Sequence, residues 1–210
     1  MAKFNKALDL IFSNQPIYIL THSLIDEKCY GISRRLNPDW KGWVRIDQIK
    51  EEFYSAKWPE VIANDLKPLA INFILTNYWK PLKLRSIPFW LAKVILELAL
   101  ENGKKDAIKI IQRAVNSVNG TIIGLKNLKI DGYLGKKTHD SITYFLDELS
   151  HIPETFFDHK ACLLSWIMYF KMDDFYKNKN EKNCKTNSIV NWTIKQVRNI
   201  FDKNIFKTSA

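Results

Sequence analysis

Residues 88–103 read Pro-Phe-Trp-Leu-Ala-Lys-Val-Ile-Leu-Glu-Leu-Ala-Leu-Glu-Asn-Gly, and this stretch decides the fold. Its first residue suits the first turn of a helix and its last residue suits a left-handed stop, so we expect a single helix between them. The only charged residues, Lys93, Glu97 and Glu101, fall at i, i+4 and i+8 on one narrow stripe, and the other faces are apolar. Exposing those faces to water would cost too much free energy, so we expect this helix in the interior of a soluble protein. It is too short and too charged to cross a bilayer.

The segments on either side of this stretch also have the apolar spacing of amphipathic helices. We expect helices over residues 4–12, 46–57, 65–78, 107–118, 138–149, 158–176 and 190–201. In the third of these, Asp65 suits the cap and Pro68 the first turn. Residues 15–33 lack a helical period and read as a loop or small hairpin, while 119–137 are rich in turn-forming glycine and 177–188 are polar and Asn-rich. The predicted fold class is mainly α, with at most a small β-hairpin.

Composition narrows the class of protein without choosing a function. The chain has 210 residues, 46% of them apolar and 13% aromatic, which is enough for a real core. Its net charge of +10 predicts attraction to a polyanion, which could be nucleic acid, an anionic membrane or a bacterial wall. The three cysteines show no CxxC spacing, so we expect free thiols rather than a disulfide scaffold or a zinc site. The N-terminus is amphipathic and unlike a Sec signal, so we expect synthesis as a soluble cytoplasmic chain, with export by another route left open.

Motifs for cofactor-dependent or nucleophilic chemistry are missing from the sequence. It contains no Gly-rich phosphate loop, His-Glu-x-x-His, Gly-x-Ser-x-Gly or dinucleotide fingerprint. His22, Asp26 and Cys29 lie close together, but their spacing fits no known metal frame, and a polar loop is the simpler interpretation. We therefore expect no cofactor and no metal.

Carboxylates offer the chemistry that needs no cofactor, which is glycoside hydrolysis. That reaction requires an acid with a raised pKa to protonate the leaving oxygen, and usually a second carboxylate or a held water. Glu97 and Glu101 are candidates because a buried helix raises a carboxyl pKa, and Asp26 and Glu27 are candidates because they lie in a loop. For each of the four, an ordinary solvated or salt-bridged side chain is the more frequent situation.

Aromatic residues are the second sign of a carbohydrate ligand, because a flat ring packs on the apolar face of a sugar. Tyr18, Tyr30, Trp40, Trp43 and Trp79 lie outside the predicted core stripes. Most aromatic residues of the chain are still expected in the core.

Several stretches, taken in order, resemble the bacterial and phage muramidases of glycoside hydrolase family 108, which carry a C-terminal peptidoglycan-binding segment. Members of that family open with an amphipathic helix, then Glu-Gly-Gly-Tyr, a loop, and Tyr-Gly-Ile-Ser or Thr. The matching pieces here are Phe4-Asn5-Lys6-Ala7-Leu8, Tyr18, Tyr30-Gly31-Ile32-Ser33, Asp65-Leu66-Lys67-Pro68, Tyr78-Trp79-Lys80-Pro81, Ile111-Gln112, Asp131-Gly132-Tyr133-Leu134-Gly135-Lys136-Lys137-Thr138 and Val190-Asn191-Trp192. Each piece alone is a weak signal, and their order carries the resemblance.

The resemblance implies a lysozyme-like helical domain around the buried central helix. Residues 1–87 would form the muramidase-like part and 88–210 the peptidoglycan-binding-like part, in one compact unit. Peptidoglycan glycan strands would be the ligand, contacted by Tyr18, Tyr30, Gly31 and Trp79. Such a protein would act at the cell wall or in the periplasm if it is exported.

The departure from the family pattern falls on the catalytic motif. Where the family has its catalytic Glu and two glycines, this chain reads Gln15-Pro16-Ile17. An amide cannot deliver a proton to a glycosidic oxygen, and Pro with Ile would crowd the space that the glycines leave. The resemblance therefore implies a muramidase descendant whose hydrolysis is lost or reduced.

Three alternatives stay open on the sequence. Hydrolysis could persist with Glu27, Asp26 or a helix glutamate as the substitute acid. The chain could instead be a non-enzymatic interaction protein in secretion or phage assembly, binding another protein. Nucleic-acid binding rests on the charge alone, and we do not expect it because the lysines are spread along the chain.

Overall fold

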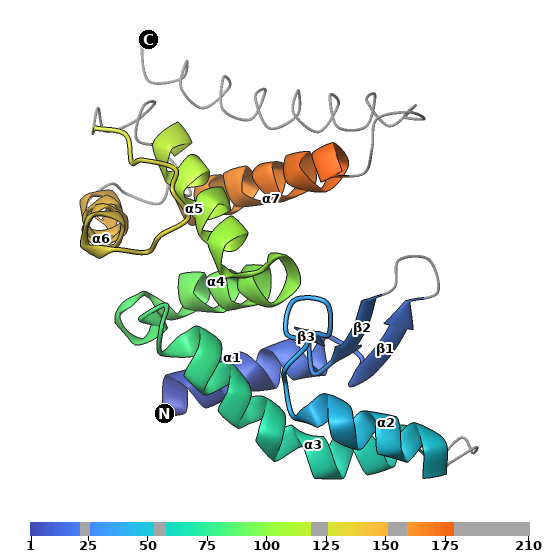
Figure 1. Ribbon diagram of the computed structural model, residues 1–210. Coiled ribbons are helices and arrows are strands. Elements are labelled where there is room, and N and C mark those ends of the chain that lie inside the picture. Colours follow the sequence, from blue (N-terminus) through green and yellow to red (C-terminus); the bar gives the residue numbers. More distant parts are fainter. Residues whose placement is uncertain (22–25, 53–57, 119–125, 151–158, 179–210) are drawn as a thin grey trace. The chain divides into compact units, whose positions relative to one another are not determined.

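The computed structural model describes residues 1–21, 26–52, 58–118, 126–150 and 159–178, and it confirms the mainly helical class (Figure 1). The chain divides into two compact units, Met1–Ile108 and Lys109–Ala210. This division falls within a helix, whereas the sequence set the boundary between residues 87 and 88.

The first unit combines helices with a small antiparallel sheet. Its elements are α1 (Ala2–Ser13), β1 (Tyr18–Thr21), β2 (Asp26–Cys29), β3 (Ile32–Ser33), α2 (Gly42–Glu52), α3 (Trp58–Ile74), the π-helical turn η1 (Leu75–Trp79), the 3-10 turn η2 (Leu84–Ser86) and α4 (Phe89–Asn102). The strand order is β1-β2-β3, with Tyr18 opposite Cys29 and Cys29 opposite Ile32. The region expected to form a loop or hairpin is therefore a hairpin with a short third strand.

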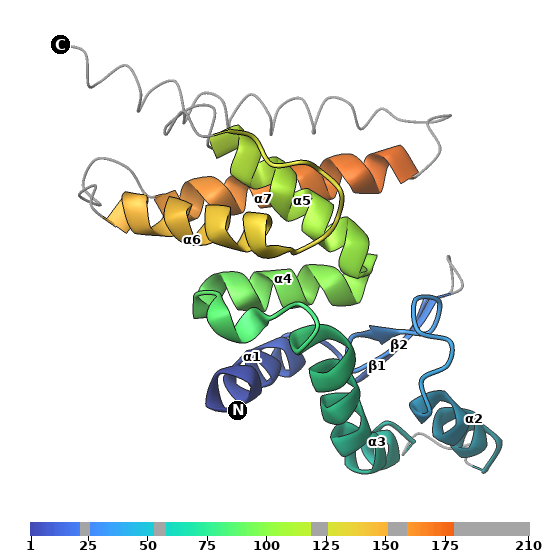
Figure 2. The same cartoon turned by 60° about the vertical axis from the view of Figure 1, so that its left-hand side comes forward.

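Helix α4 is the predicted central helix, and it lies at the core of the first unit. It contacts α1, β3, η1 and η2, and Figure 2 shows α1 running beside it. Its buried residues are Leu91, Ala92, Ile95, Leu96, Leu98, Ala99 and Leu100. Pro88 precedes the helix instead of joining its first turn. Gly103 ends it at φ 85° and ψ 156°, which is not the left-handed helical geometry that we predicted.

The predicted start of the third helix at Asp65 is wrong. Helix α3 begins at Trp58, and Pro59, its second residue, is where a missing backbone N–H is tolerated. Asp65 lies inside the helix, and its Oδ2 accepts from Nη2 of Arg45 on α2 at 3.0 Å. Pro68 also lies inside the helix, on its exposed side. A start signal at Pro59 thus overrides the one that we inferred at Asp65.

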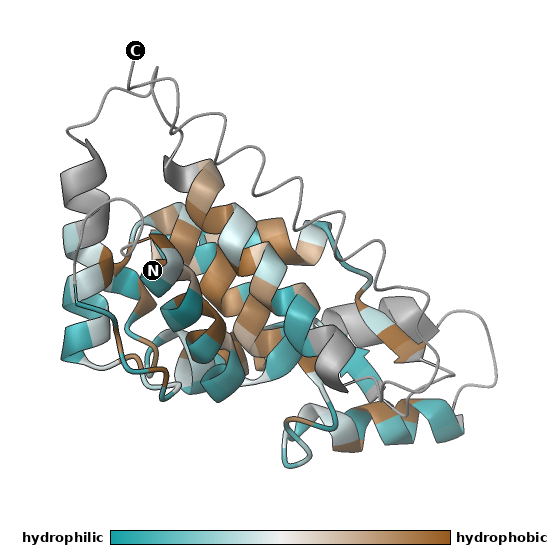
Figure 3. Cartoon of the chain, turned by 90° about the horizontal axis from the view of Figure 1, so that it is seen from above, coloured by the Kyte–Doolittle hydropathy of each residue, from teal (hydrophilic) through white to brown (hydrophobic). Residues whose placement is uncertain are grey.

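The second unit begins within α5 (Lys104–Val118) and continues with α6 (Lys136–Ser150) and α7 (His159–Asn178). The predicted apolar stripe of α5 is buried: Ala107, Ile111, Ala114 and Val118. Figure 3 shows brown apolar residues interleaved with teal polar residues along the helices, as expected for amphipathic elements. The predicted loop over 177–188, apart from its first two residues, and the predicted helix over 190–201 lie outside the described residues.

Among the residues that the structure describes, Cys29 in the first unit and Cys162 in the second are buried cysteines. Burial, followed by the nearby charge of Glu27, raises the pKa of Cys29 to about 12. None of the described helices has the length and apolar content that a bilayer span requires. The described residues also contain no group of three or more His, Cys, Asp or Glu side chains placed to hold a metal ion.

Candidate functional site

Gln15 lies just after α1, and its side chain reaches the turn between β2 and β3. Its Oε1 is 3.1 Å from the position that a Cβ would take on Gly31. Tyr30 and Gly31 form that turn with positive φ values of 51° and 77°. Because Gly31 has no side chain, the Gln15 amide can approach the turn closely. Residue 15 therefore lies beside the Tyr30–Gly31 turn.

Two of the aromatic residues predicted to contact glycan are buried. Tyr30 is 4% exposed, and its ring packs on Phe12 at a centroid distance of 4.7 Å. Burial also raises the pKa of Tyr30. Trp79 is 5% exposed and packs on Phe4 at 5.3 Å. Neither ring presents a face on which a sugar could stack, so we remove both from the proposed direct contacts.

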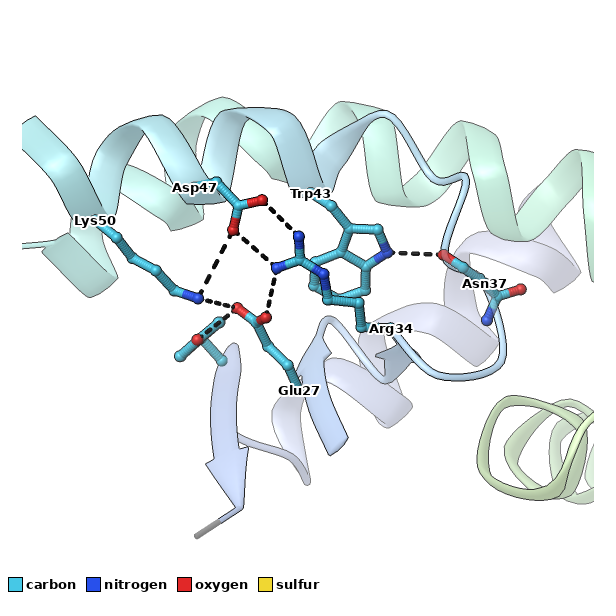
Figure 4. Close-up of polar contacts among 7 residues, drawn as sticks. Glu27, Arg34, Asn37, Trp43, Asp47 and Lys50 are labelled. Atoms are coloured by element: carbon cyan, nitrogen blue, oxygen red, sulfur yellow. Dashed lines mark hydrogen bonds and ion pairs between the residues drawn. The ribbon is translucent and has the colours of Figure 1, made fainter. Parts of the chain in front are cut away.

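Glu27 on β2 is a buried carboxylate held by three donors (Figure 4). The Tyr18 hydroxyl donates to its Oε1 at 2.6 Å, and Lys50 Nζ on α2 donates to the same oxygen at 2.7 Å. Arg34 Nη1 donates to Oε2 at 2.7 Å. Both oxygens of Glu27 are therefore engaged, and the side chain ties β2 to β1 and to α2.

Arg34 extends this network to α2. Its Nη1 also donates to Oδ1 of Asp47 at 2.8 Å, and its guanidinium lies 5.3 Å from the ring centre of Trp43. The Trp43 indole N–H donates to the backbone oxygen of Asn37 at 2.7 Å, as Figure 4 shows. Hydrogen bonds from Arg34 hold the pKa of Asp47 below its usual range, and the same bonds raise the pKa of Arg34.

The electrostatics of this network oppose an acid role for Glu27. Burial alone would raise its pKa, but hydrogen bonds from Lys50, Tyr18 and Arg34 outweigh burial and lower the pKa below the usual value. The pKa of Tyr18 is raised, first by burial and then by its bond to Glu27. Glu27 is thus ionised at neutral pH, whereas a general acid must carry a proton there.

The remaining predicted carboxylates lie apart from Gln15 in sequence and element. Asp26 begins β2 opposite Thr21, and its side chain lies outside the described part of the chain, as does all of His22. Glu97 on α4 accepts from Lys93 at 2.6 Å, one turn earlier on the same helix. Glu101 is half-buried on α4.

The second unit contains a polar centre that sequence reasoning did not identify. Gln112 on α5 is fully buried, and its Nε2 donates to Oδ1 of Asp131 at 2.9 Å and to Thr138 Oγ1 at 3.3 Å. Its Oε1 accepts from the Gly132 amide at 2.9 Å. The sequence contained the signal as two separate pieces, Ile111-Gln112 and residues 131–138, and the structure brings them into contact.

Comparison with models of known protein families finds no match, and comparison with curated proteins finds none either.

Proposed function

We propose that this protein is a lysozyme-like binder of bacterial peptidoglycan, derived from an N-acetylmuramidase whose hydrolysis is lost or reduced. The observation that carries the proposal is the Gln15 amide beside Gly31, directly after the first helix and at the edge of a three-stranded antiparallel sheet. In the family that the sequence resembles, the catalytic Glu follows such a helix. The fold alone does not imply this function, so the proposal depends on residue 15 and its surroundings.

The chemistry of the site supports binding without cleavage. Protonating a glycosidic oxygen requires an acid, and an amide at residue 15 has no proton that it can transfer at neutral pH. Glu27 is an acidic residue of the adjoining sheet, and its oxygens are engaged by three donors. Tyr18, which is half-buried, remains the aromatic ring that we propose for glycan contact, with Gly31 providing close backbone approach.

The experiment measures two properties of one protein sample: sedimentation with insoluble peptidoglycan and release of reducing ends from it. We expect the wild-type protein to sediment and to release almost no reducing ends. Gln15→Glu should increase that release, because it places a carboxyl beside Gly31. Gln48→Glu, which makes the same change at an exposed residue of α2, is the matched control and should leave release unchanged.

Two other results would replace the proposal. Strong release by the wild type, abolished in a folded Glu27→Gln variant, would indicate an active muramidase with a relocated carboxylate. No sedimentation at low salt would favour a non-enzymatic interaction protein instead.

A further inference from the structure

Residues 80–87, between η1 and α4, bury their apolar side chains and expose their basic ones. The buried residues of this segment are Leu82, Leu84 and Ile87. Its three basic residues, Lys80, Lys83 and Arg85, are all exposed. The Lys83 amide donates to the Lys80 carbonyl at 3.0 Å, and the Ser86 amide donates to the Lys83 carbonyl at 3.2 Å. The three cations are therefore carried by an ordered run of turns.

Lys83 has a backbone conformation that is unfavourable for a residue with a side chain. Its φ of 49° and ψ of 35° lie in the left-handed region. There the Cβ comes too close to the backbone, a contact that glycine does not make. Folding alone therefore does not explain a lysine at this position. Residues held in such conformations are found most often at functional sites.

Helix α1 adds two more lysines beside this segment. The Lys3 ammonium donates to the carbonyl oxygen of Arg85 at 3.2 Å and also to that of Ile87. Lys6, one turn later, is exposed, and its Nζ lies 5.1 Å from the ring centre of Phe89 at the start of α4. These contacts place the start of α1 next to residues 80–87. We call the resulting set of cations the basic patch: Lys3, Lys6, Lys80, Lys83 and Arg85.

Carboxylates near the patch are few. The sequence contains no Asp or Glu between Asp65 and Glu97. In the part of the chain that the structure describes, the side chains of Lys80, Lys83 and Arg85 form no ion pair. On α1, Asp9 lies one turn after Lys6 and is exposed. The patch therefore carries an excess of positive charge, which attracts an anionic surface.

The make-up of the patch favours one kind of anionic surface. Clusters of about four to eight Lys and Arg residues bind the headgroups of anionic lipids. Proteins that bind single-stranded nucleic acid also present aromatic rings on which bases stack. Phe89, the ring that contacts the patch, is half-buried and has Lys6 over its face. The major groove of a duplex admits a helix or a β-ribbon, whereas three of the five cations here lie in turns.

We propose that the basic patch docks the first unit on the surface of an anionic lipid bilayer, through the phosphates of the lipid headgroups. This inference goes beyond the proposed function and does not depend on it, because it concerns other residues and another partner. Each exposed cation acts through its charge, so the affinity for the bilayer falls with every cation removed and with rising salt.

The test is co-sedimentation of the full chain with vesicles of phosphatidylcholine and phosphatidylglycerol, mixed about two to one, and with vesicles of phosphatidylcholine alone. We expect binding to the anionic vesicles only. Lys83→Gln/Arg85→Gln should bind them at least about tenfold more weakly. Lys41→Gln/Lys105→Gln removes the same charge at two exposed residues elsewhere in the first unit. This matched control should stay within about twofold of the wild-type affinity.

Lys83→Gly separates membrane binding from stability. The substitution removes the charge and the left-handed strain together. We expect the affinity for anionic vesicles to fall about fivefold, while the urea midpoint stays the same or rises. Weaker binding by a protein at least as stable as wild type would not be an effect of misfolding.

Three results would overturn the inference. The first is a wild-type protein that does not bind anionic vesicles at low salt. The second is an equal loss of affinity in the two double variants, which would assign the attraction to net charge rather than to the patch. The third is wild-type vesicle affinity in Lys83→Gln/Arg85→Gln together with weaker binding to double-stranded DNA, which would assign the patch to nucleic acid.

Discussion

Glu27 shows how a carboxylate can be buried without becoming an acid. Its side chain is 9% exposed, and it bonds to Lys50 and Arg34, each 35% exposed. An ionised carboxylate is costly to bury unless donors compensate for the lost water. Here the compensation comes from both neighbouring elements, so the charge of Glu27 contributes to stability and its proton affinity falls.

The lowered pKa of Glu27 predicts a loss of stability in acid. A group with a depressed folded pKa stabilises the protein above its unfolded pKa of about 4.3, and this contribution disappears as the pH falls through the folded pKa. We expect the free energy of unfolding to drop on acidification below about pH 5, measured by urea unfolding at a series of pH values. Glu27→Gln should be less stable near neutrality and should lose less on acidification. Parallel pH profiles for the two proteins would contradict this assignment.

Some residue positions could be predicted from the sequence and others could not. The sequence placed Gln15 directly after the first helix, and the structure adds that its amide lies beside the Tyr30–Gly31 turn. The exposure expected for Trp79 did not hold, because Trp79 is buried in the π-helical turn η1 and packs on Phe4 of α1. The partners of Glu27 were unpredictable because Lys50 lies 23 positions further along the chain.

At the level of elements, Gly103 joins α4 to α5 in a conformation that other residues avoid. Its φ of 85° with ψ of 156° belongs to a region that is essentially restricted to glycine. The next residue, Lys104, already starts α5. The corner between the two helices therefore requires glycine for its backbone geometry.

Gly103→Ala should lower the free energy of unfolding by about 1–3 kcal/mol because of this strain. Space is not the obstacle, since the nearest atom to an added Cβ would be Leu36 Cδ2 at 3.8 Å. Lys105→Ala, two residues later at an exposed site, is the control and should change stability by less than about 0.5 kcal/mol. Equal urea midpoints for the two variants would show that the corner relaxes.

Gln112→Ala should loosen the segment that carries Tyr133. It leaves the half-buried Gly132 amide without its Gln112 acceptor, and an unsatisfied buried donor costs up to about 1–3 kcal/mol. We expect faster hydrogen exchange at the Gly132 amide and a lower urea midpoint than wild type. Gln48→Ala on the exposed side of α2 serves as the control. Unchanged exchange at Gly132 in Gln112→Ala would mean that other contacts hold the segment.

Element types were more predictable than their limits. The amphipathic stripes of α1, α4 and α5 came directly from apolar spacing, and most of their residues are buried. Phe12 on α1 and Trp90 and Val94 on α4 are half-buried. The start of α3 was missed because two prolines in one helix offer two start signals. Spacing alone cannot choose between them.

For the whole molecule, the net charge of +10 predicts a salt-sensitive interaction with the anionic wall. Raising the salt from about 0.05 to about 0.5 M shortens the range of electrostatic attraction several-fold. We therefore expect the sedimented fraction of protein to fall over that range. A fraction that does not change would indicate that stacking and hydrogen bonds, rather than charge, provide the affinity. The same titration with uncharged chitin beads is the control, and it should depend little on salt.

The division into units was the least predictable property. A domain boundary is usually read from a linker rich in glycine, proline or polar residues. Here the boundary lies between Ile108 and Lys109, inside the continuous helix α5, where the sequence shows only amphipathic spacing.

The two buried thiols, one in each unit, allow the opening rate of each unit to be measured separately. Alkylating reagents attack thiolates, so Cys29 and Cys162 react only when their surroundings open. In a Cys184→Ser variant, mass spectrometry of pulse-alkylated protein would give one alkylation rate for each unit, from Cys29 and from Cys162. Equal alkylation rates would indicate that the whole molecule opens in one step. Different rates would indicate that the two units open independently.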